Sequence, residues 1–407
     1  MTDSEHRAAE MTPCRVVIVG GGPAGMLLAY QLASNGVDVT VLERHPDFDR
    51  EFRGELLQAS VVEELEKAGV MRILLERGLA LPGIRRRMLL GTSREVRIPG
   101  GTERGAIVSQ PGMLALLHEL CGRYPNYRME FRTTVLDAVR EDGRVAALQT
   151  RREGKEGRVS GDLFLVCNGR NSHLRKGCGL TTRQFETTAD AMWLRFDFAD
   201  APEALPKTLD VQMFGKGRVV VLQPTTRNHL HIAYSEPGDL RALHDNLPEL
   251  RKRLLQCVPA GLRPHLDRKL DERTEWQALK ILVDRVDSWH APGVLFLGDA
   301  AHTMSPAGGQ GLNLAIRDTF AAANHILDAL REGRVVDAGV LQAVQDEREP
   351  EIDAIQAAQT RAGRMVLKPL PALHVMFSLL GVAMKLMGKR MQGQSPPLTR
   401  PRYFTKV

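Results

Sequence analysis

Two glycine-rich segments near opposite ends of the chain contain the residues best suited to bind a phosphorylated ligand. The first, Gly20-Gly21-Gly22-Pro23-Ala24-Gly25, has the pattern G-x-G-x-x-G. In this pattern Gly20 permits a tight turn, Gly22 lets a pyrophosphate approach the backbone, and Gly25 lets a helix pack closely on a strand. The N–H groups at the start of that helix attract the anion. Glu43 lies 23 residues after Gly20, close to the spacing of about 20 expected for a carboxylate that binds a ribose hydroxyl, so this segment predicts a dinucleotide site.

The second segment begins at Gly298-Asp299, directly after the apolar stretch Val294–Leu297. A carboxylate at the end of a buried strand can accept hydrogen bonds from a polyol chain. Gly308-Gly309-Gln310-Gly311 then opens a predicted helix, whose unpaired N–H groups suit a partly anionic ring edge. One long ligand stretched between the two segments would use both of them, which favours FAD over NAD.

Buried strands must bring these segments together. Arg15–Val19 is a continuous β-branched run, typical of a strand that is buried on both faces of a parallel sheet. Pro23 suits the first turn of a helix, Gly36 suits its end, and Val37–Leu42 predicts the next strand. The result is a βαβ unit. Leu163–Val166 predicts a further buried strand of the same sheet.

The middle and the end of the chain predict different layers. Short strands between Met192 and Tyr234, with a turn at Gly215-Lys216-Gly217, indicate an inserted antiparallel sheet, and Asp142-Gly143 predicts a β-hairpin. Long helices are predicted over 311–331, 337–362 and 366–389. The expected fold class is therefore α/β: a Rossmann-like domain with an inserted antiparallel-sheet domain and a long C-terminal helical segment.

The composition excludes several classes of protein. The 407 residues include 55 Lys and Arg against 49 Asp and Glu, and no basic run with interleaved aromatic residues is present, so no nucleic-acid partner is predicted. Five cysteines without a CxxC pair argue against a zinc ribbon or a disulfide scaffold and indicate reduced thiols in a cytoplasm. The polar N-terminus is not a secretory signal. His229 and His231 alternate on a strand, which is a weak metal signal, and no metal site is predicted.

Two uncharged stretches resemble membrane spans in length or hydropathy. Val16–Val37 has 22 such residues, but the glycines and proline of the first segment would expose its backbone to lipid, so it predicts a strand, a turn and a helix. Pro369–Met384 has 16 and predicts a packed C-terminal helix, with contact to a membrane surface or to a second copy as the alternatives. No transmembrane segment is predicted.

The motifs GGGPAG, VLER and GDAAHTMSPAGGQGLNLAIRD together resemble those of the single-component FAD-dependent aromatic hydroxylases, the flavoprotein monooxygenases typified by para-hydroxybenzoate hydroxylase. The resemblance extends over residues 15–330 and includes the order and the spacing of the motifs. It implies FAD as cofactor and NADPH or NADH as co-substrate. It also implies that a flavin hydroperoxide transfers one atom of dioxygen to a small, aromatic or heteroaromatic substrate.

The sequence also predicts how the chain is divided. A tail (1–14) precedes a discontinuous FAD-binding domain (15–80, 101–180 and 281–335), a substrate-binding sheet domain (81–100 and 181–280) and C-terminal helices (336–407).

Residue roles follow from the same resemblance. The first loop would bind the ADP half of FAD, Glu43 its ribose and Asp299 its ribityl chain, while the start of the late helix would lie against the isoalloxazine. The implied cofactor-binding residues are Gly20, Gly22, Pro23, Ala24, Gly25, Glu43, Arg44, Arg53, Gln110, Val135, Asp299, Gly309, Gly311, Leu312 and Asn313. Arg53 and Pro306 are the expected active-site residues, and the expected substrate contacts on the inserted sheet are Arg195, Gln212, Phe214 and Tyr234. His231 is a further polar residue on those strands.

One motif departs from the family pattern. The third segment, Cys167 to Arg175, has Asn168 where the family normally has Asp. Asparagine has the same shape and keeps an acceptor oxygen but loses the charge. The family's residue is thought to serve both FAD and the reduced nicotinamide, so the substitution bears on nicotinamide use.

Several alternatives stay open at this stage. The same fold could serve an oxidase, a reductase or a halogenase, or a flavin-binding module without activity. A short-chain dehydrogenase is disfavoured, because no tyrosine has a lysine four residues later. The sequence does not choose between NADPH and NADH. It does not choose between hydroxylation, epoxidation, Baeyer–Villiger insertion and N-oxidation, and it identifies neither the substrate nor the oligomeric state, for which a homodimer is one possibility.

Overall fold

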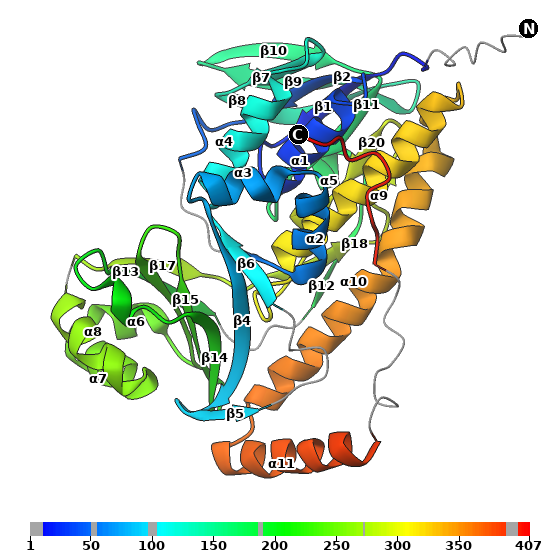
Figure 1. Cartoon of the computed structure of the whole chain (residues 1–407). Coiled ribbons are helices and arrows are strands. Elements are labelled where there is room, and N and C mark those ends of the chain that lie inside the picture. Colours follow the sequence, from blue (N-terminus) through cyan, green and yellow to red (C-terminus); the bar gives the residue numbers. More distant parts are fainter. Residues whose placement is uncertain (1–10, 50–54, 97–103, 186–189, 272, 388–397) are drawn as a thin grey trace, which may run out of the picture.

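The computed structural model of the chain describes residues 11–49, 55–96, 104–185, 190–271, 273–387 and 398–407. Its largest parts are a parallel sheet with helices, a second and wider sheet, and a long C-terminal helical segment (Figure 1).

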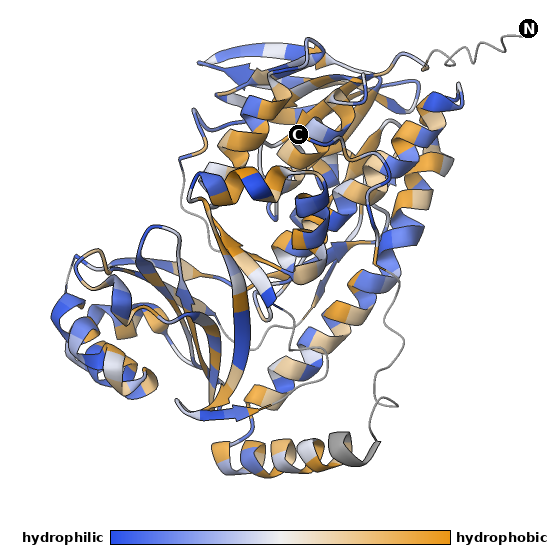
Figure 2. Ribbon diagram, in the orientation of Figure 1, coloured by the Kyte–Doolittle hydropathy of each residue, from blue (hydrophilic) through white to orange (hydrophobic). Residues whose placement is uncertain are grey.

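A six-stranded sheet forms the base of the cofactor-binding part. Its strands, in spatial order, are β19 (His290–Ala291), β20 (Val294–Phe296), β11 (Leu163–Val166), β1 (Arg15–Val19), β2 (Asp38–Leu42) and β7 (Tyr127–Glu130). All neighbouring strands are parallel except β19 and β20. Strands β11 and β20, and β1 after Arg15, are apolar along their length, as expected for a sheet covered on both faces (Figure 2).

Among the described residues, four helices of more than ten residues belong to this part. They are α1 (Pro23–Ala33), α4 (Gln110–Cys121), α9 (Gly311–Arg331) and α10 (Ala338–Val366). Helix α1 packs against both α4 and α9, and α9 packs against α10. The predicted βαβ unit is confirmed, because β1, α1 and β2 follow one another and β1 pairs in parallel with β2. Since β1, β11 and β20 run in the same direction, the loops that follow them meet at one edge of the sheet.

The second sheet has nine strands and is mixed. Its spatial order is β17 (Glu275–Leu279), β13 (Ala191–Asp197), β16 (His229–Ser235), β15 (Arg218–Pro224), β14 (Thr208–Gly215), β4 (Ala80–Leu90), β6 (Arg104–Val108) and β3 (Leu56–Leu57), with β5 (Arg94–Val96) paired to β4. The antiparallel pattern expected for this layer holds except between β14 and β4, which are parallel. The sheet also includes β3 and β6, which lie in segments that the sequence division assigned to the cofactor-binding domain. Long-range pairing joins these strands to the sheet, and no local pattern in the sequence reports it.

The two faces of the nine-stranded sheet have different neighbours. One face packs with helices α6 (Leu240–Asp245), α7 (Leu247–Cys257) and α8 (Arg263–Lys269), around a core that includes Leu194, Leu222 and Ile232. The residues next to these on each strand point the other way, because side chains alternate along a strand. That second face includes Leu209, which packs with Leu56. We call it the pocket face.

Smaller elements complete the cofactor-binding part. They are helices α2 (Ala59–Lys67), α3 (Val70–Glu76) and α5 (Leu174–Gly177), the sheet β8 (Thr133–Glu141), β9 (Arg144–Arg152) and β10 (Lys155–Ser160), and the sheet β12 (Thr182–Phe185), β18 (Val283–Val286) and β21 (His302–Thr303). The predicted hairpin is confirmed, with Asp142 and Gly143 both at positive φ between β8 and β9.

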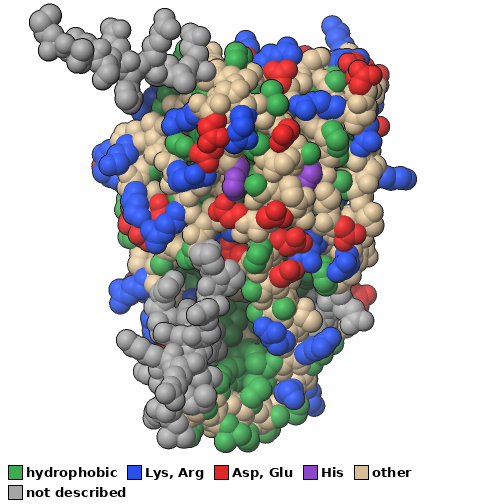
Figure 3. Space-filling view, turned by 90° about the vertical axis from the view of Figure 1, so that its right-hand side faces the viewer, with side chains coloured by type: hydrophobic (Ala, Val, Ile, Leu, Met, Phe, Trp, Pro, Cys, Tyr) green, Lys and Arg blue, Asp and Glu red, His purple; other side chains and the backbone are tan. Residues whose placement is uncertain are grey.

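The C-terminal helix predicted from the apolar stretch is α11 (Leu370–Met387). Leu373 and Phe377 pack against strands β4 and β14, whereas Val375, Leu379 and Val382 are more than half exposed. Figure 3 shows hydrophobic side chains gathered at the lower end of the face that carries this helix. Among the described residues, no helix is long and apolar enough to cross a bilayer.

Both described ends of the chain pack on the cofactor-binding part. The segment 398–407 lies along α1 and α9, where Tyr30 donates to the carbonyl of Thr405 and Asn324 donates to that of Arg400. Thr12 donates to the carbonyl of Leu330, and Met11 packs on the core. Residues 11–14, predicted as part of a loose tail, are therefore held to the domain, while residues 1–10 lie outside the described part.

Candidate cofactor and substrate sites

The first glycine loop, between β1 and α1, combines two tight contacts with one open position. Gly20 has φ +103°, and a Cβ there would lie 2.7 Å from the carbonyl oxygen of Cys167. A Cβ on Gly25 would lie 1.9 Å from the carbonyl oxygen of Gly20. A Cβ on Gly22, the residue that precedes α1, would meet no atom within 4 Å. Gly20 and Gly25 are thus required by the fold itself, whereas Gly22 leaves space at a helix N-terminus.

Glu43 at the end of β2 is turned toward this loop. Its side chain is 3% exposed, and its carboxylate accepts hydrogen bonds from the backbone N–H of Gly21 at 2.7 Å and of His45 at 2.9 Å. Arg44 lies beside it with an exposed side chain that contacts His45 at 3.2 Å. The carboxylate is therefore fixed next to the backbone that a dinucleotide would approach.

The late loop after β20 is held in place by a buried arginine. Arg175 donates to the carbonyl oxygens of Asp299 at 2.8 Å and Ala300 at 2.7 Å, and forms a two-point ion pair with Asp284 at 2.7 and 3.2 Å. Arg175 is the last residue of the third motif, and the sequence alone assigned it no role. Nothing in a single sequence distinguishes a buried arginine from an exposed one, so the signal for this contact was weak. Arg175 positions the backbone that carries Asp299.

A second buried network supports the same loop. Asp318 accepts hydrogen bonds from the N–H of Gly298 at 2.9 Å, from His302 Nε2 at 2.7 Å and from Arg348 Nε at 2.8 Å. The burial of Asp318 would raise the pKa of its carboxyl, but His302 and Arg348 outweigh that effect and hold the pKa below its usual range. Arg348 comes from α10, so two helices and the loop are joined through one carboxylate. His302 belongs to this network through its contact with Asp318.

The two loops meet, as the sequence analysis requires. A Cβ added to Gly298 would lie 3.9 Å from the Cβ of Ala24 in the first loop. One carboxylate oxygen of Asp299 would lie 3.8 Å from a Cβ on Gly311, the first residue of α9. Asp299 is also 3.8 Å from Arg170 in the third motif, and its burial raises the pKa of its carboxyl. The two glycine loops and the third motif therefore border one crevice.

The start of α9 is fixed by the side chain of Asn313. Its amide nitrogen donates to the carbonyls of Leu56 and Gly309, both at 2.9 Å, and its oxygen accepts from the N–H of Gln58 at 2.7 Å. Asn313 is fully buried. Its side chain thus closes the loop, while the first N–H groups of the helix, including those of Gly311 and Leu312, have no intrahelical acceptor. These donors can face a ligand.

The arrangement fits a dinucleotide such as FAD. Gly22 leaves room at one helix N-terminus, and a second helix N-terminus stands at Gly311. Beside the first loop, where a Cβ on Gly20 would lie 3.0 Å from the Cα of Asn168, the buried Oδ1 atom of Asn168 has no hydrogen-bond partner among the described residues. A buried amide oxygen without a donor is costly, and a hydroxyl-rich ligand would supply that donor. The residue that departs from the family motif is therefore still equipped to bind the cofactor.

A pocket of about 290 Å³ lies between the pocket face of the sheet and the start of α4. Trp193, Arg195 and His231 line it from β13 and β16, and Ser109 and Pro111 line it from the other side. Gln110 lies between those last two residues and is buried in the first turn of α4. Glu55, directly before β3, completes the inner end.

The expected substrate residues divide between the two faces of the sheet. Arg195 lines the pocket and pairs with Glu275 at 2.5 Å. Gln212, Phe214 and Tyr234 do not line it: Tyr234 lies in the core beneath α6–α8 and donates to Glu236 at 2.8 Å, Phe214 packs on that core, and Gln212 pairs with Val220 of the same core. Strand alternation is the physical reason, because register decides which face each residue takes.

The remaining expected positions are as follows. Val135 is buried in β8, and Pro306 is exposed on the loop before α9. Arg53 lies outside the described residues. The sequence analysis missed Glu55 and Gln223, which lie together at the pocket's inner end. The strand register could have placed Gln223 on the same face as the pocket residues, since Gln223 pairs with His231 and His231 pairs with Arg195.

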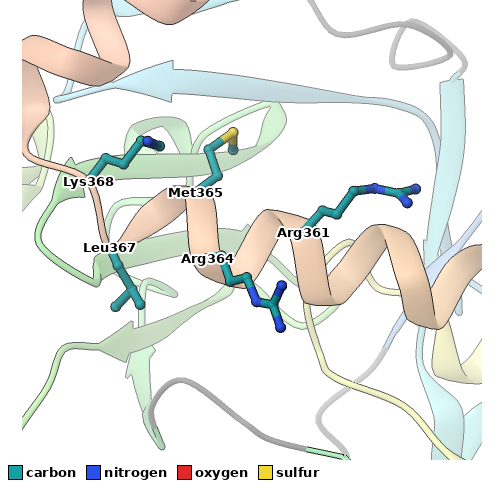
Figure 4. Close-up of a pocket in the computed structure, with 5 residues that line it drawn as sticks. All are labelled: Arg361, Arg364, Met365, Leu367 and Lys368. Carbon is teal, nitrogen blue, oxygen red and sulfur yellow. The ribbon is translucent and has the colours of Figure 1, made fainter.

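A second hollow lies where α10 ends. It is lined by Arg361, Arg364, Met365, Leu367 and Lys368. In Figure 4 the charged ends of Arg361, Arg364 and Lys368 lie apart from one another, so they do not converge on one ligand. Cations at a helix C-terminus are favoured by the helix dipole. Among the described residues, no cluster of His, Cys, Asp and Glu could hold a metal ion.

Known proteins resemble this chain along most of its length. The sequence model of the family described as "FAD binding domain" matches residues 13–358. The chain is 29% identical to 6-methylpretetramide 4-monooxygenase of Streptomyces rimosus, over 90% of this chain and 88% of that protein. It is 26% identical to dialkyldecalin synthase of Streptomyces rugosporus, over 90% of this chain and 75% of that protein. Among solved structures, p-nitrophenol 4-monooxygenase PnpA of Pseudomonas putida DLL-E4 has a TM-score of 0.76 at 19% identity, over 94% of this chain and 95% of that one.

Proposed function

Because the chain belongs to the FAD-binding-domain family, we propose that it is a flavoprotein monooxygenase that uses NADPH or NADH and dioxygen to oxidise a small aromatic or heteroaromatic molecule. FAD is the cofactor of this family. The relatives that carry monooxygenase names support the reaction type, and the chain covers most of the length of the first of them.

The observation that carries the proposal is a shared wall between crevice and pocket. Asn313, at the α9 end of the crevice, binds the carbonyl of Leu56. The preceding residue, Glu55, lines the pocket. The ring end of a dinucleotide at α9 and a substrate in the pocket would therefore be neighbours, as oxygen transfer between them requires.

Bound FAD supplies the redox chemistry, by which hydride from the nicotinamide is used to activate dioxygen, one atom enters the substrate and the other leaves as water. The residues of the chain orient and stabilise. The first loop, Glu43 and Asp299 are placed to hold the phosphate, ribose and ribityl groups. The N–H groups at the start of α9 are placed to stabilise negative charge on the ring. The pocket between the sheet and α4 is placed to hold the substrate beside the reacting end of the cofactor.

Turnover measurements test this function. The purified protein should be yellow, and a suitable aromatic compound should accelerate its oxidation of NADPH or NADH. The product should have gained one oxygen atom, with one dioxygen consumed for each nicotinamide oxidised. If no member of a broad aromatic panel accelerates nicotinamide oxidation, the assignment as a monooxygenase fails.

A second candidate is a flavoprotein that does not consume NAD(P)H. Two observations favour keeping it: one relative is a dialkyldecalin synthase, and Asn168 stands where the family has the residue thought to serve the nicotinamide. Mixing the purified protein with NADPH or NADH under anaerobic conditions separates the two. Rapid bleaching of the flavin in the presence of substrate supports the monooxygenase, and a flavin that stays oxidised supports the alternative.

Location and assembly are further parts of the proposal. All five cysteines are free thiols, which agrees with a cytoplasmic protein. We include a homodimer as the assembly to test by light scattering, since α11 exposes Val375, Leu379 and Val382 on one stripe.

A further inference from the structure

We propose that Glu55 is the proton acceptor of the substrate pocket, and that Glu55 and His231 together select planar substrates that present a weakly acidic hydroxyl group and reject those that present a carboxylate. The proposal rests on the function proposed above, because it names the substrate class of the same pocket.

The first ground is the geometry of two incompletely paired groups. The carboxyl of Glu55 accepts a hydrogen bond from Gln223 Nε2 at 3.2 Å and lies 3.9 Å from His231 Nδ1. The second distance is too long for a hydrogen bond. His231 is only 8% exposed, and its Nδ1 has no partner among the described residues. A buried ring nitrogen without a hydrogen-bond partner is unusual, and a ligand in the pocket could supply that partner. A hydroxyl group in the pocket can donate to Glu55 and contact His231 with the same oxygen.

The second ground is the charge state of this pair. Burial raises the pKa of Glu55 to about 7, although the hydrogen bond from Gln223 and the charge of Arg227 act against it. Burial lowers the pKa of His231 to about 4, and His229 and Arg195 add to that effect. At neutral pH the imidazole is therefore uncharged, so the two groups are not an ion pair.

The charged side chains near Glu55 are paired with other residues or are exposed to solvent. Arg195 is paired with Glu275, while Arg227 and Asp49 are exposed residues of the pocket lining. Near neutral pH Glu55 is divided between its two protonation states, which suits a residue that takes up and releases a proton in turnover.

The third ground is the shape of the wall. The Trp193 ring meets the His231 ring edge to face, with centroids 5.5 Å apart, and both line the pocket. On the same face, Leu209 and Ile84 form an apolar cluster with Leu56. A flat, apolar ring can lie along this wall while its polar substituent reaches the inner end.

The proton step is simple to balance. The O–H bond of the substrate breaks, its electron pair stays on the substrate oxygen, and the proton forms an O–H bond with the Glu55 carboxylate. The resulting oxyanion makes the ring richer in electrons and a better acceptor of an electrophilic oxygen atom. Glu55 later returns the proton to water at the pocket mouth. A substrate carboxylate cannot donate a proton, and at pH 8 it would place a second negative charge beside Glu55.

Two sets of matched compounds test the selection: 4-methylphenol, 4-methylanisole and 4-methylbenzoate, and the corresponding 2-naphthol, 2-methoxynaphthalene and 2-naphthoate. Calorimetry at pH 8, with the oxidised holoenzyme and no NAD(P)H, measures their binding. In at least one set we expect the hydroxyl compound to bind about tenfold more tightly than its methyl ether, which corresponds to ~1.4 kcal/mol, and the carboxylate to bind most weakly. Because binding needs no turnover, the result stands whether or not the monooxygenase assignment holds.

Glu55→Gln keeps the shape of the side chain but cannot take up the proton. It should reduce the preference for hydroxyl over ether to less than threefold in the same set, and should weaken the rejection of the carboxylate. Glu236→Gln is the control away from the pocket, because Glu236 is a buried glutamate that contacts Tyr234, Arg218 and Arg253 and does not line the pocket. That variant should keep the preference. His231→Gln serves as the second pocket variant and should lower the affinity for the hydroxyl compound.

The pH dependence of 2-naphthol binding reports the acceptor, because a hydroxyl group donates a stronger hydrogen bond to a carboxylate than to a protonated carboxyl. The affinity of the wild-type holoenzyme should rise severalfold as the pH passes through the pKa of Glu55, about 7, and the affinity of Glu55→Gln should not. Equal binding of hydroxyl compounds and ethers by the wild type in both sets, or an unchanged preference in Glu55→Gln, would overturn the proposal.

Discussion

The cofactor crevice and the substrate pocket handle buried polar groups in opposite ways. Around the crevice, Arg175, Asp318 and Asn313 each have at least three hydrogen bonds to the protein. In the pocket, among the described residues, the carboxyl of Glu55 has one hydrogen-bond partner and His231 Nδ1 has none. The loops of the crevice are thus held in place before a ligand arrives, with Asn168 Oδ1 left for the ligand to pair, whereas the groups at the inner end of the pocket depend mainly on a ligand to complete their hydrogen bonds. Cofactor binding benefits from backbone and side chains that are already in place. Substrate recognition can use polar atoms that have no hydrogen-bond partner within the protein.

The sharpest test of this contrast compares two arginine–carboxylate pairs. Arg175→Leu would leave Asp284 buried without its partner and would free the carbonyls of the late loop. It should cost about 3–5 kcal/mol of unfolding free energy and most of the bound FAD. Arg195→Leu breaks the pair with Glu275, whose side chains are 36% and 52% exposed, and should cost no more than about 1 kcal/mol. Chemical denaturation and the ratio of flavin to protein absorbance measure both. Equal losses would contradict the contrast.

Substitutions at two glycines of the first loop should have different effects, one on the stability of the fold and the other on the affinity for FAD. Gly25→Ala would place a Cβ 1.9 Å from a backbone oxygen and should destabilise the domain by about 1–3 kcal/mol or more. The yield of soluble protein should be low, and the protein that is recovered should be colourless because it lacks FAD. Gly22→Ala meets no atom within 4 Å, so it should leave the melting temperature of the apoprotein unchanged. Its added methyl group faces the ligand side, and the affinity for FAD should fall about tenfold. Fluorescence titration of apoprotein with FAD distinguishes these outcomes, and unaltered affinity in Gly22→Ala would argue that the dinucleotide does not approach there.

The raised pKa of Glu55 should make the free energy of unfolding depend on pH. The pKa of Glu55 is about 7 in the fold and near 4.5 when unfolded, so the folded protein holds an extra proton between these values. Its stability therefore falls as pH rises from 4.5 to 7, by up to ~3 kcal/mol in total. Glu55→Gln removes that loss. The variant should be more stable than the wild type by about 1–3 kcal/mol at pH 8 and no more stable at pH 5.

His231 contributes to this dependence with the opposite sign. Its lowered pKa makes stability fall as pH drops from 6.5 to 4. That contribution is common to both proteins and cancels in the comparison. Thermal denaturation across this pH range provides the measurement, and a difference that does not depend on pH would mean that Glu55 is ionised normally.

The smallest expected effect concerns Gln212, a residue first assigned to the substrate. Both polar atoms of its side chain are buried without partners in the described structure, and they lie away from the pocket. Gln212→Met, of similar size, should raise stability by about 1 kcal/mol and leave the affinity for pocket ligands unchanged. A marked loss of ligand affinity would show that our assignment of the sheet faces is wrong.

Local patterns were sufficient for the frame of the fold. The β-branched run before Gly20 predicted a buried parallel strand, Pro23 predicted the start of α1, and the Asp142-Gly143 pair predicted the β8–β9 hairpin. Each depends on interactions between residues close in sequence, such as turn geometry and burial on both faces. Membership of β3 and β6 in the large sheet depends on pairing with β4 instead, and the sequence division placed them elsewhere.

The sequence by itself determined that this chain carries two glycine loops fit for one dinucleotide, because a tight turn and a close backbone approach demand particular residue types at particular spacings. Only the tertiary structure decided which polar residues line the pocket. A strand register places Arg195 and His231 on one face and Tyr234 on the other, and long-range packing brings Glu55 to Gln223 across 168 positions of the chain. Residue type is a local property, whereas facing and burial depend on partners that are distant in sequence.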